Sequence, residues 1–313
     1  MAKAGVPTLS LAQYTNGDAE ARAAFSKDLM SALQRYGFFV LKDHPVSVAT
    51  LDRAYDLSAA FFAQSEATKR HYIGGQRGYT PFGVEHAKNN KAADLKEFWQ
   101  IGPERPEAAG AKYGDIAPPN VWPDQPAGFK ETFTELYNGL QYTGEVILEA
   151  LAPQLDLPKD YFAPLVADGN SVFRLLHYPP IPKDVDPNCV RAAAHEDINF
   201  ITLLVAAQGA GLELLDRDGT WLPVEAEKNQ LIVDSGDMLA RMTNDVIPAT
   251  THRVVNPKGP NVSRYSMPFF MHPNSDVSLK CLPSCVGDGA KYPEIAAGAF
   301  LAQRLKEIGL IKT

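Results

Sequence analysis

Apolar residues recur at helical spacing through the first half of the chain. Between Asp18 and Tyr36, the side chains of Phe25, Leu29 and Leu33 share one helical stripe, which predicts an amphipathic helix. Gly37 follows directly and is expected to end this helix. Three more helices are predicted from the same spacing. The first is capped by Ser47 and carries Leu51, Ala54, Leu57 and Phe61, and the second begins at about Gly128 and carries Phe129, Phe133, Leu136 and Leu140. The third lies near Glu294 to Ile308 and carries Phe300, Leu301 and Leu305.

The pattern changes between Ser171 and Met271, where short apolar runs alternate with turn residues. Such runs predict strands, and Arg217-Asp218-Gly219 predicts a hairpin turn between two of them. Phe38 to Leu41 is predicted to be an earlier strand. The stretch from Gly74 to Asn120 is rich in Gly, Pro, Asn and charge, which indicates loops with short strands, of which Glu97 to Ile101 is the most ordered part.

These elements predict a mixed α/β (α+β) fold with a double-stranded β-helix, or jelly-roll, core flanked by helices. A closed two-sheet jelly roll hides its strand edges and leaves an interior space for a ligand. We expect a single domain spanning residues 1–313. Within it we expect a mainly helical N-terminal region at 1–170, the jelly-roll core at 171–272 and a C-terminal helical tail at 273–313.

Composition narrows the class of protein. Apolar residues make up 45% of the chain and charged residues 21%, which suits one sizeable core. The net charge is −7 and no run is rich in Lys and Arg, so neither nucleic acid nor an anionic membrane is expected as a partner. No apolar run reaches the length of about 20 residues that spans a bilayer, and the N-terminus lacks the apolar segment of a signal peptide. Three cysteines, an odd and sparse set, favour a reducing compartment, and we expect a cytoplasmic protein.

One set of metal-ligating residue types stands out. His195 and Asp197 are two residues apart, just before the apolar run Phe200 to Val205, and on a strand residues i and i+2 point to the same face. His252, in the strand-like run Thr250 to Val255, supplies a second imidazole. Two imidazoles and one carboxylate form the facial triad of non-haem Fe(II) oxygenases. A zinc-dependent hydrolase could use the same ligands. His195, Asp197 and His252 are called the triad below.

A candidate anion-binding pair follows the triad. Arg264 and Ser266 are also spaced i, i+2 on a predicted strand, so a guanidinium and a hydroxyl should point the same way. A guanidinium fork binds a carboxylate through two parallel charge-assisted bonds. The alternative is an internal salt bridge to a nearby acid. A zinc hydrolase would leave this pair without a task, so the order of triad and pair favours an anchor for an anionic cosubstrate.

The pattern of His195-x-Asp197, His252 and Arg264-x-Ser266 resembles a known family. It is similar to the isopenicillin N synthase-like branch of the Fe(II)/2-oxoglutarate-dependent dioxygenases. The likeness covers nearly the whole chain. Further segments that carry it are Ser10 to Leu41, Phe61-Phe62, Arg174 to Pro180, Gly211 to Leu214, Gly219 to Val224, Gly236 to Leu239 and Thr243-Asn244.

The resemblance implies Fe(II) as the cofactor, bound by the triad, and 2-oxoglutarate as the cosubstrate, bound by Arg264, Ser266 and Tyr178. It implies an enzyme that uses dioxygen to hydroxylate a small-molecule substrate and releases succinate and CO2, with no catalytic residue beyond the metal centre. Two alternatives stay open. One is an iron oxidase of the isopenicillin N synthase type that needs no 2-oxoglutarate, and the other is a non-enzymatic metal- or metabolite-binding protein. Many plant members carry Asn where this chain has Leu176, so the contact made by that Asn is missing or supplied elsewhere.

Three residues are candidates for contact with the substrate. Asn199 shares a predicted strand face with the triad residues His195 and Asp197, so its amide could orient a substrate or bond to a neighbouring strand. Tyr79 and Phe98 lie in the loop-rich stretch and could help to form the mouth of the cavity. Simple core packing is the alternative for both aromatic residues.

Overall fold

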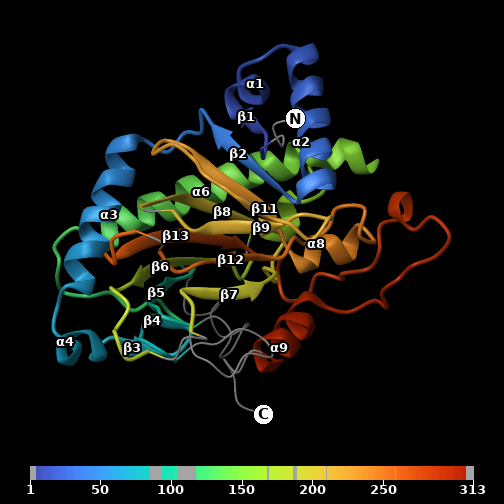
Figure 1. The fold of residues 1–313 in the computed structure, drawn as a ribbon. Coiled ribbons are helices and arrows are strands. Elements are labelled where there is room, and N and C mark those ends of the chain that lie inside the picture. Colours follow the sequence, from blue (N-terminus) through green and yellow to red (C-terminus); the bar gives the residue numbers. More distant parts are fainter. Residues whose placement is uncertain are drawn as a thin grey trace.

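A large twisted sheet forms the centre of the molecule (Figure 1). The computed structural model describes residues 5–84, 94–104, 118–167, 169–185, 189–208, 210–257 and 259–307. Within these residues the large sheet has nine strands, and the pairing is antiparallel except for that between the first two. Their order is β1 (Thr8–Ser10), β2 (Phe38–Lys42), β11 (Leu231–Ser235), β8 (Ile201–Gln208), β13 (Arg264–Met271), β6 (Val172–Tyr178), β5 (Glu97–Ile101), β4 (Arg77–Thr80) and β3 (Ile73–Gly74).

A smaller sheet faces the large one. Its four strands are ordered β10 (Trp221–Pro223), β9 (Leu212–Leu215), β12 (His252–Val254) and β7 (Ala192–His195). Apolar side chains from both sheets meet in one cluster, which includes Leu176 and Leu204 from the large sheet and Leu212, Leu214 and Val254 from the small one. Two sheets that enclose a shared interior are the jelly roll that the strand pattern predicted.

Helices cover the other face of the large sheet. α6 (Phe129–Leu151) contacts β8 and β13, and α2 (Ala19–Tyr36) and α3 (Val48–Phe62) pack beside it (Figure 1). The alternation of side chains along a strand explains the two layers. On β8, Leu203 belongs to the large core on the helical side, whereas Leu204 belongs to the cluster between the sheets. The remaining helices are α1 (Leu11–Thr15), α4 (Glu66–Arg70), α7 (Ala163–Val166), α8 (Asp237–Met242) and α9 (Ala297–Glu307), with 3-10 turns at Ala152–Leu155 and Pro283–Cys285.

Local sequence signals explain the helix ends. The Asp18 carboxylate accepts a hydrogen bond from the backbone N–H of Ala21 at 2.9 Å and so caps α2. Gly37 ends the same helix in the left-handed region, with φ of 64°. A Cβ added to Gly37 would lie 2.2 Å from Oγ1 of Thr250, so the position is closed to a larger residue on steric grounds as well. The predictions of a cap at Ser47 and of a hairpin turn at Gly219 are also confirmed.

The N-terminal half contributes more to the sheet than the sequence indicated. We expected the jelly-roll core at 171–272, yet β1 to β5 all precede residue 171 and extend the large sheet on both sides. β5 lies between β4 and β6, and all five of its residues are buried. The loop-rich stretch therefore supplies an interior strand. Residues 85–93 and 105–117 of that stretch, and Ile308 at the end of the predicted last helix, lie outside the described residues.

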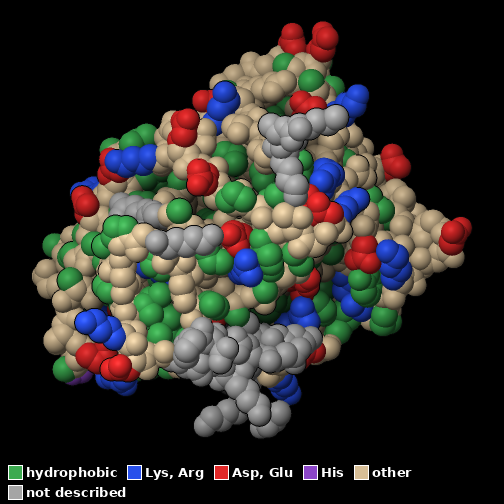
Figure 2. All heavy atoms as spheres, in the orientation of Figure 1, with side chains coloured by type: hydrophobic (Ala, Val, Ile, Leu, Met, Phe, Trp, Pro, Cys, Tyr) green, Lys and Arg blue, Asp and Glu red, His purple; other side chains and the backbone are tan. Residues whose placement is uncertain are grey.

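The surface carries charge of both signs. On the face shown in Figure 2, acidic and basic side chains are interspersed among apolar and neutral ones. In the part of the chain that the structure describes, no helix combines the length and the apolar character needed to cross a bilayer.

Candidate active site

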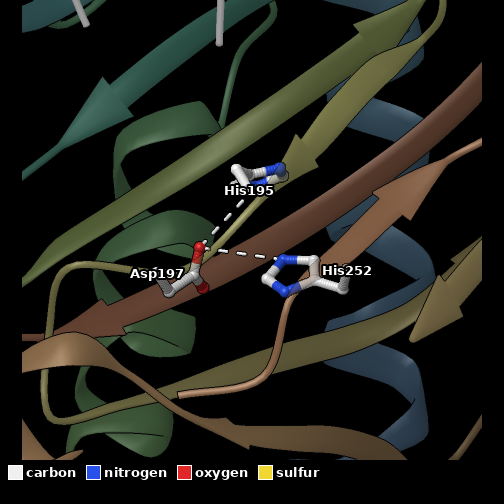
Figure 3. A group of neighbouring side chains, drawn as sticks. All are labelled: His195, Asp197 and His252. Carbon is white, nitrogen blue, oxygen red and sulfur yellow. Dashed lines mark ion pairs between the residues drawn. The ribbon is translucent and has the colours of Figure 1, made fainter. Parts of the chain in front are cut away.

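The three residues of the triad come together at one end of the small sheet (Figure 3). His195 ends β7 and His252 begins β12, and the two residues are cross-strand partners. Asp197 follows β7 by two residues. Its Oδ1 lies 3.8 Å from Nε2 of His195 and 3.8 Å from Nε2 of His252. One ligand atom from each residue lies within 4.8 Å of the others, so the three can surround a single ion.

Hydrogen bonds fix which imidazole nitrogen faces the centre. Nδ1 of His195 donates to the carbonyl of Ala193 at 2.7 Å, and Nδ1 of His252 donates to the carbonyl of Thr250 at 3.1 Å. Each Nε2 therefore carries a lone pair on the side of Asp197, as metal-binding histidines require. Burial, reinforced by the nearby His195, lowers the pKa of His252 to about 4, so this imidazole is neutral at pH 7. Two imidazole nitrogens and a carboxylate fit a divalent first-row metal such as Fe(II).

A hydrogen bond orients the carboxylate of Asp197 from the side away from the histidines. Oγ1 of Thr202, on β8, donates a short hydrogen bond to Oδ2 of Asp197, which leaves Oδ1 facing the histidines. Thr202 in turn accepts a hydrogen bond from Nδ2 of Asn199 at 2.8 Å. Asp197 and His252 are buried, whereas the side chain of His195 is 36% exposed. The triad thus lies in a protein interior that opens beside His195.

Arg264 and Ser266 line the same cavity as the triad. Arg264 begins β13 and pairs with Tyr178 on β6, while Ser266 pairs with Leu176. Both are almost fully buried, and the guanidinium carbon of Arg264 lies 5.1 Å from the centre of the Tyr178 ring. The cavity has a volume of about 70 Å³ and is partly open to solvent. It brings a cationic fork, a hydroxyl and an aromatic ring within one enclosure with a candidate metal centre.

Sequence and structure comparisons decide the family. Residues 169–273 match the 2OG-Fe(II) oxygenase superfamily, and residues 6–125 match the family described as non-haem dioxygenase in morphine synthesis N-terminal. The chain is 33% identical to the 2-oxoglutarate-Fe(II) type oxidoreductase HxnY of Emericella nidulans, over 94% of this chain and 88% of that protein. The protein belongs to the 2OG-Fe(II) oxygenase superfamily. It is therefore an Fe(II)- and 2-oxoglutarate-dependent oxygenase.

The oxygenase is also similar to another hydroxylase and to two solved structures. The proline hydroxylase BuaE of Petromyces alliaceus is 31% identical, over 92% of this chain and 94% of that protein. The crystal structure of a 2OG-Fe(II) oxygenase family protein from Caulobacter crescentus has a TM-score of 0.85 at 47% identity, covering 96% of this chain and 98% of that one. A full-length Neurospora crassa protein, crystallised in complex with alpha-KG and thymine, has a TM-score of 0.86 at 28% identity, covering 98% of each chain.

The residues proposed for substrate contact have varied positions in the oxygenase. Asn199 is fully buried, and its amide donates a hydrogen bond to the hydroxyl of Thr202. It therefore contacts the residue that orients Asp197. Tyr79 is fully buried on the helical side of the large sheet, where its hydroxyl donates to Glu97. Phe98 belongs to the apolar cluster between the sheets, next to Leu176 and Leu204. Of the three, Phe98 is the one that packs in the layer that encloses the cavity.

Sequence reasoning missed several polar residues of the cavity wall. Thr202 and Asp234 are cross-strand partners on β8 and β11, and both line the cavity. Burial, followed by the nearby charge of Asp197, raises the pKa of the fully buried Asp234 carboxyl well above its ordinary value. Arg174 on β6 and Lys96 also line the cavity. A signal for the first two was available, because Thr202 lies inside an apolar run and Asp234 directly follows one, and a polar group buried there needs a partner.

Proposed function

We propose that the triad holds Fe(II) and that Arg264, Ser266 and Tyr178 hold 2-oxoglutarate. The observation that supports this assignment is that the clustered ligand atoms and the buried Arg264–Ser266 pair line one cavity. The alternative is an internal salt bridge between Arg264 and a nearby acid, and the comparison of Arg264→Lys with the wild type distinguishes the two.

Each residue of the cavity would have a role that follows from its position. When bound, Fe(II) with 2-oxoglutarate and dioxygen supplies the oxidising power, and the cosubstrate is converted to succinate and CO2. The Arg264 fork and the Ser266 hydroxyl would bind the far carboxylate of the cosubstrate, with the ring of Tyr178 packed against the guanidinium. Thr202 would hold Asp197 so that Oδ1 faces the metal. Leu176 and Leu204 would exclude water from the cavity wall.

We propose that the reaction is hydroxylation of a small molecule. Two relatives support this, since one is a proline hydroxylase and another was crystallised with thymine. We further propose one functional domain over 1–313, because strands from both halves of the chain pair in one sheet. The three free cysteines support a cytoplasmic location, as expected from the sequence.

An anaerobic titration tests the assignment. Adding Fe(II) and then 2-oxoglutarate should produce the visible metal-to-ligand absorption band of a chelated 2-oxo acid. Arg264→Lys should need more 2-oxoglutarate to produce the band, and Asp197→Ala should need more iron. Absence of the band in the wild-type protein would contradict the proposal. Succinate release with candidate small molecules then identifies the substrate.

A further inference from the structure

A buried guanidinium lies near the cosubstrate anchor, just before β7. Arg191 is only 3% exposed, and β7 begins at the next residue and ends at His195 of the triad. Four residues of extended chain span about 13 Å, so Arg191 and His195 lie at opposite ends of this strand. Nη2 of Arg191 donates to the carbonyl of Val262 at 2.7 Å, and Val262 precedes Arg264 by two residues. Arg191 therefore belongs to the end of the cavity where Arg264 lies.

Arg191 and Arg264 lie beside the same aromatic ring. The guanidinium carbon of Arg191 is 6.0 Å from the centre of the Tyr178 ring, and that of Arg264 is 5.1 Å from it. Burial, followed by the nearby charge of Arg264, lowers the pKa of Arg191, as expected where two cations are close together in the interior. Both side chains stay charged at neutral pH, because a guanidinium is too basic to lose its proton there. This end of the cavity therefore holds two positive charges.

The contacts of Arg191 with the described residues leave its charge without a countercharge. Its Nη2 bonds to a neutral carbonyl, its Nε is buried with no hydrogen-bond partner, and no carboxylate among those residues forms an ion pair with it. A buried cation without a countercharge is costly, and a second cation nearby adds repulsion. An anion bound at this end of the cavity would offset both costs.

Arg191 acts on such an anion without touching it. The described residues that line the cavity include Tyr178, Ala192 and Arg264, but not Arg191. A ligand would therefore contact Tyr178 and Arg264, while Arg191 attracts it through its charge and supports the ring of Tyr178. Attraction of this kind extends over several ångströms in a buried site, because little water is present to screen it.

We propose that Arg191 is a positioning residue of the cosubstrate anchor, and that its charge makes the anchor a two-cation site for the far carboxylate of 2-oxoglutarate. This inference rests on the function proposed above, because it takes Arg264, Ser266 and Tyr178 as the residues that touch that carboxylate. The alternative is a structural role alone, in which Arg191 ties the start of β7 to Val262. The two roles differ in their effect on a ligand that has no far carboxylate.

Two 2-oxo acids of equal chain length test the proposal. 2-Oxoglutarate carries the far carboxylate, whereas 2-oxopentanoate has the same five-carbon chain and the same 2-oxo acid end but lacks it. Each is titrated anaerobically into Fe(II)-loaded protein, and the metal-to-ligand absorption band gives its dissociation constant. Arg191→Gln and Arg191→Met remove the charge, and the Met variant leaves no buried amide unpaired. Arg191→Lys keeps the charge. Iron affinity, measured without a 2-oxo acid, reports that each variant is folded.

Arg241→Gln is the matched control. Nη2 of Arg241 also donates to a backbone carbonyl, that of Pro293, and its guanidinium carbon lies 4.9 Å from the centre of the Tyr292 ring. Its Nε is likewise buried with no hydrogen-bond partner among the described residues. Arg241 lies on α8 and is not among the described residues that line the cavity. Its loss removes a similarly packed guanidinium without changing the charge at the anchor.

We expect the wild type to bind 2-oxoglutarate about tenfold or more tightly than 2-oxopentanoate. In the two neutral variants the affinity for 2-oxoglutarate should fall about tenfold, while the affinities for 2-oxopentanoate and for iron stay within about twofold of the wild type. Arg191→Lys should keep most of the preference for 2-oxoglutarate, because it keeps the charge, and Arg241→Gln should keep all of it.

Three results would overturn the proposal. Neutral variants that no longer bind iron, or that lose affinity for both 2-oxo acids equally, would assign Arg191 a structural role. Neutral variants that keep the wild-type preference for 2-oxoglutarate would show that its charge does not act on the far carboxylate, and this inference alone would fail. A wild type with no absorption band, or with no preference for 2-oxoglutarate, would overturn the proposed function as well.

Discussion

His195 and His252 are directly opposed on neighbouring strands, and the centres of their rings are 4.4 Å apart. This pairing places two Nε2 atoms on the same side of the small sheet, where Asp197 faces both. The backbone pairing of β7 and β12 therefore brings together two histidines that are far apart in the sequence. The predictions below follow from that arrangement and from the groups around it.

Replacing Asp197 or His252 by Ala should greatly weaken iron binding. Each change removes one of three protein ligands, so the loss of affinity should exceed the roughly 10–100-fold that follows loss of a group that merely supports a ligand. Equilibrium titration with Fe(II) under anaerobic conditions measures the affinity. His71→Ala is the control, because His71 is exposed and lies outside the cavity. Full stoichiometry with wild-type affinity in Asp197→Ala would refute the assignment.

Thr202→Val should weaken iron binding without removing a ligand. Valine has nearly the shape of threonine but cannot donate to Oδ2 of Asp197, so the carboxylate loses its orientation. We expect a loss of about 10–100-fold in iron affinity. Thr202→Ser keeps the hydroxyl and should stay close to the wild type. Equal affinities for the Val and Ser variants would show that the hydrogen bond does not position the ligand.

Arg264→Lys should raise the 2-oxoglutarate requirement while iron binding stays the same. Lysine keeps the charge but loses the fork, and charge-assisted bonds worth roughly 1.5–3 kcal/mol correspond to about one to two orders of magnitude in affinity. Ser266→Ala removes one neutral donor and should have a milder effect. The absorption band titrated with 2-oxoglutarate gives both values. Unchanged affinity in Arg264→Lys together with a lower melting temperature would instead indicate a structural salt bridge.

Asp234→Asn should stabilise the metal-free protein at neutral and alkaline pH. Burial raises the pKa of Asp234 in the folded state, so the folded protein keeps a proton that the unfolded chain releases. The free energy of unfolding therefore falls as pH rises above the ordinary carboxyl pKa of about 4, until the folded pKa is reached. Each pH unit within this interval lowers the free energy of unfolding by about 1.4 kcal/mol. The test compares melting temperatures of the two proteins in chelator, and a gain at pH 8 no larger than that at pH 4 would contradict it.

Arg264 and Ser266 are two residues apart on β13, and that spacing places both side chains on one strand face. His195 and Asp197 have the same spacing, but β7 ends at His195, so Asp197 approaches both histidines from the segment that follows the strand. The sequence could not show which strands are neighbours. Asp234 meets Asp197 only because β11 pairs with β8, and this register depends on the packing of the whole sheet.

The same reason explains what was missed in the fold. Glu97 to Ile101 reads as a short strand in a polar stretch, and its interior place in the sheet depends on pairing with β6, far along the chain. Asn199 shares the spacing of the triad but lies beyond the end of β7. Its side chain turns to Thr202 instead, so the alternation of a strand does not extend to it.

The triad histidines belong to the small sheet, whereas Arg264 belongs to the large one. A dicarboxylate bound by the triad at one end and by Arg264 at the other must therefore bridge the gap between the two sheets. The length of this gap then selects the length of the dicarboxylate. The gap itself is set by the apolar side chains that hold the sheets apart, such as Leu204 and Leu214, rather than by either end group. The oxygenase would then distinguish five-carbon from four- or six-carbon 2-oxo diacids through its interior packing.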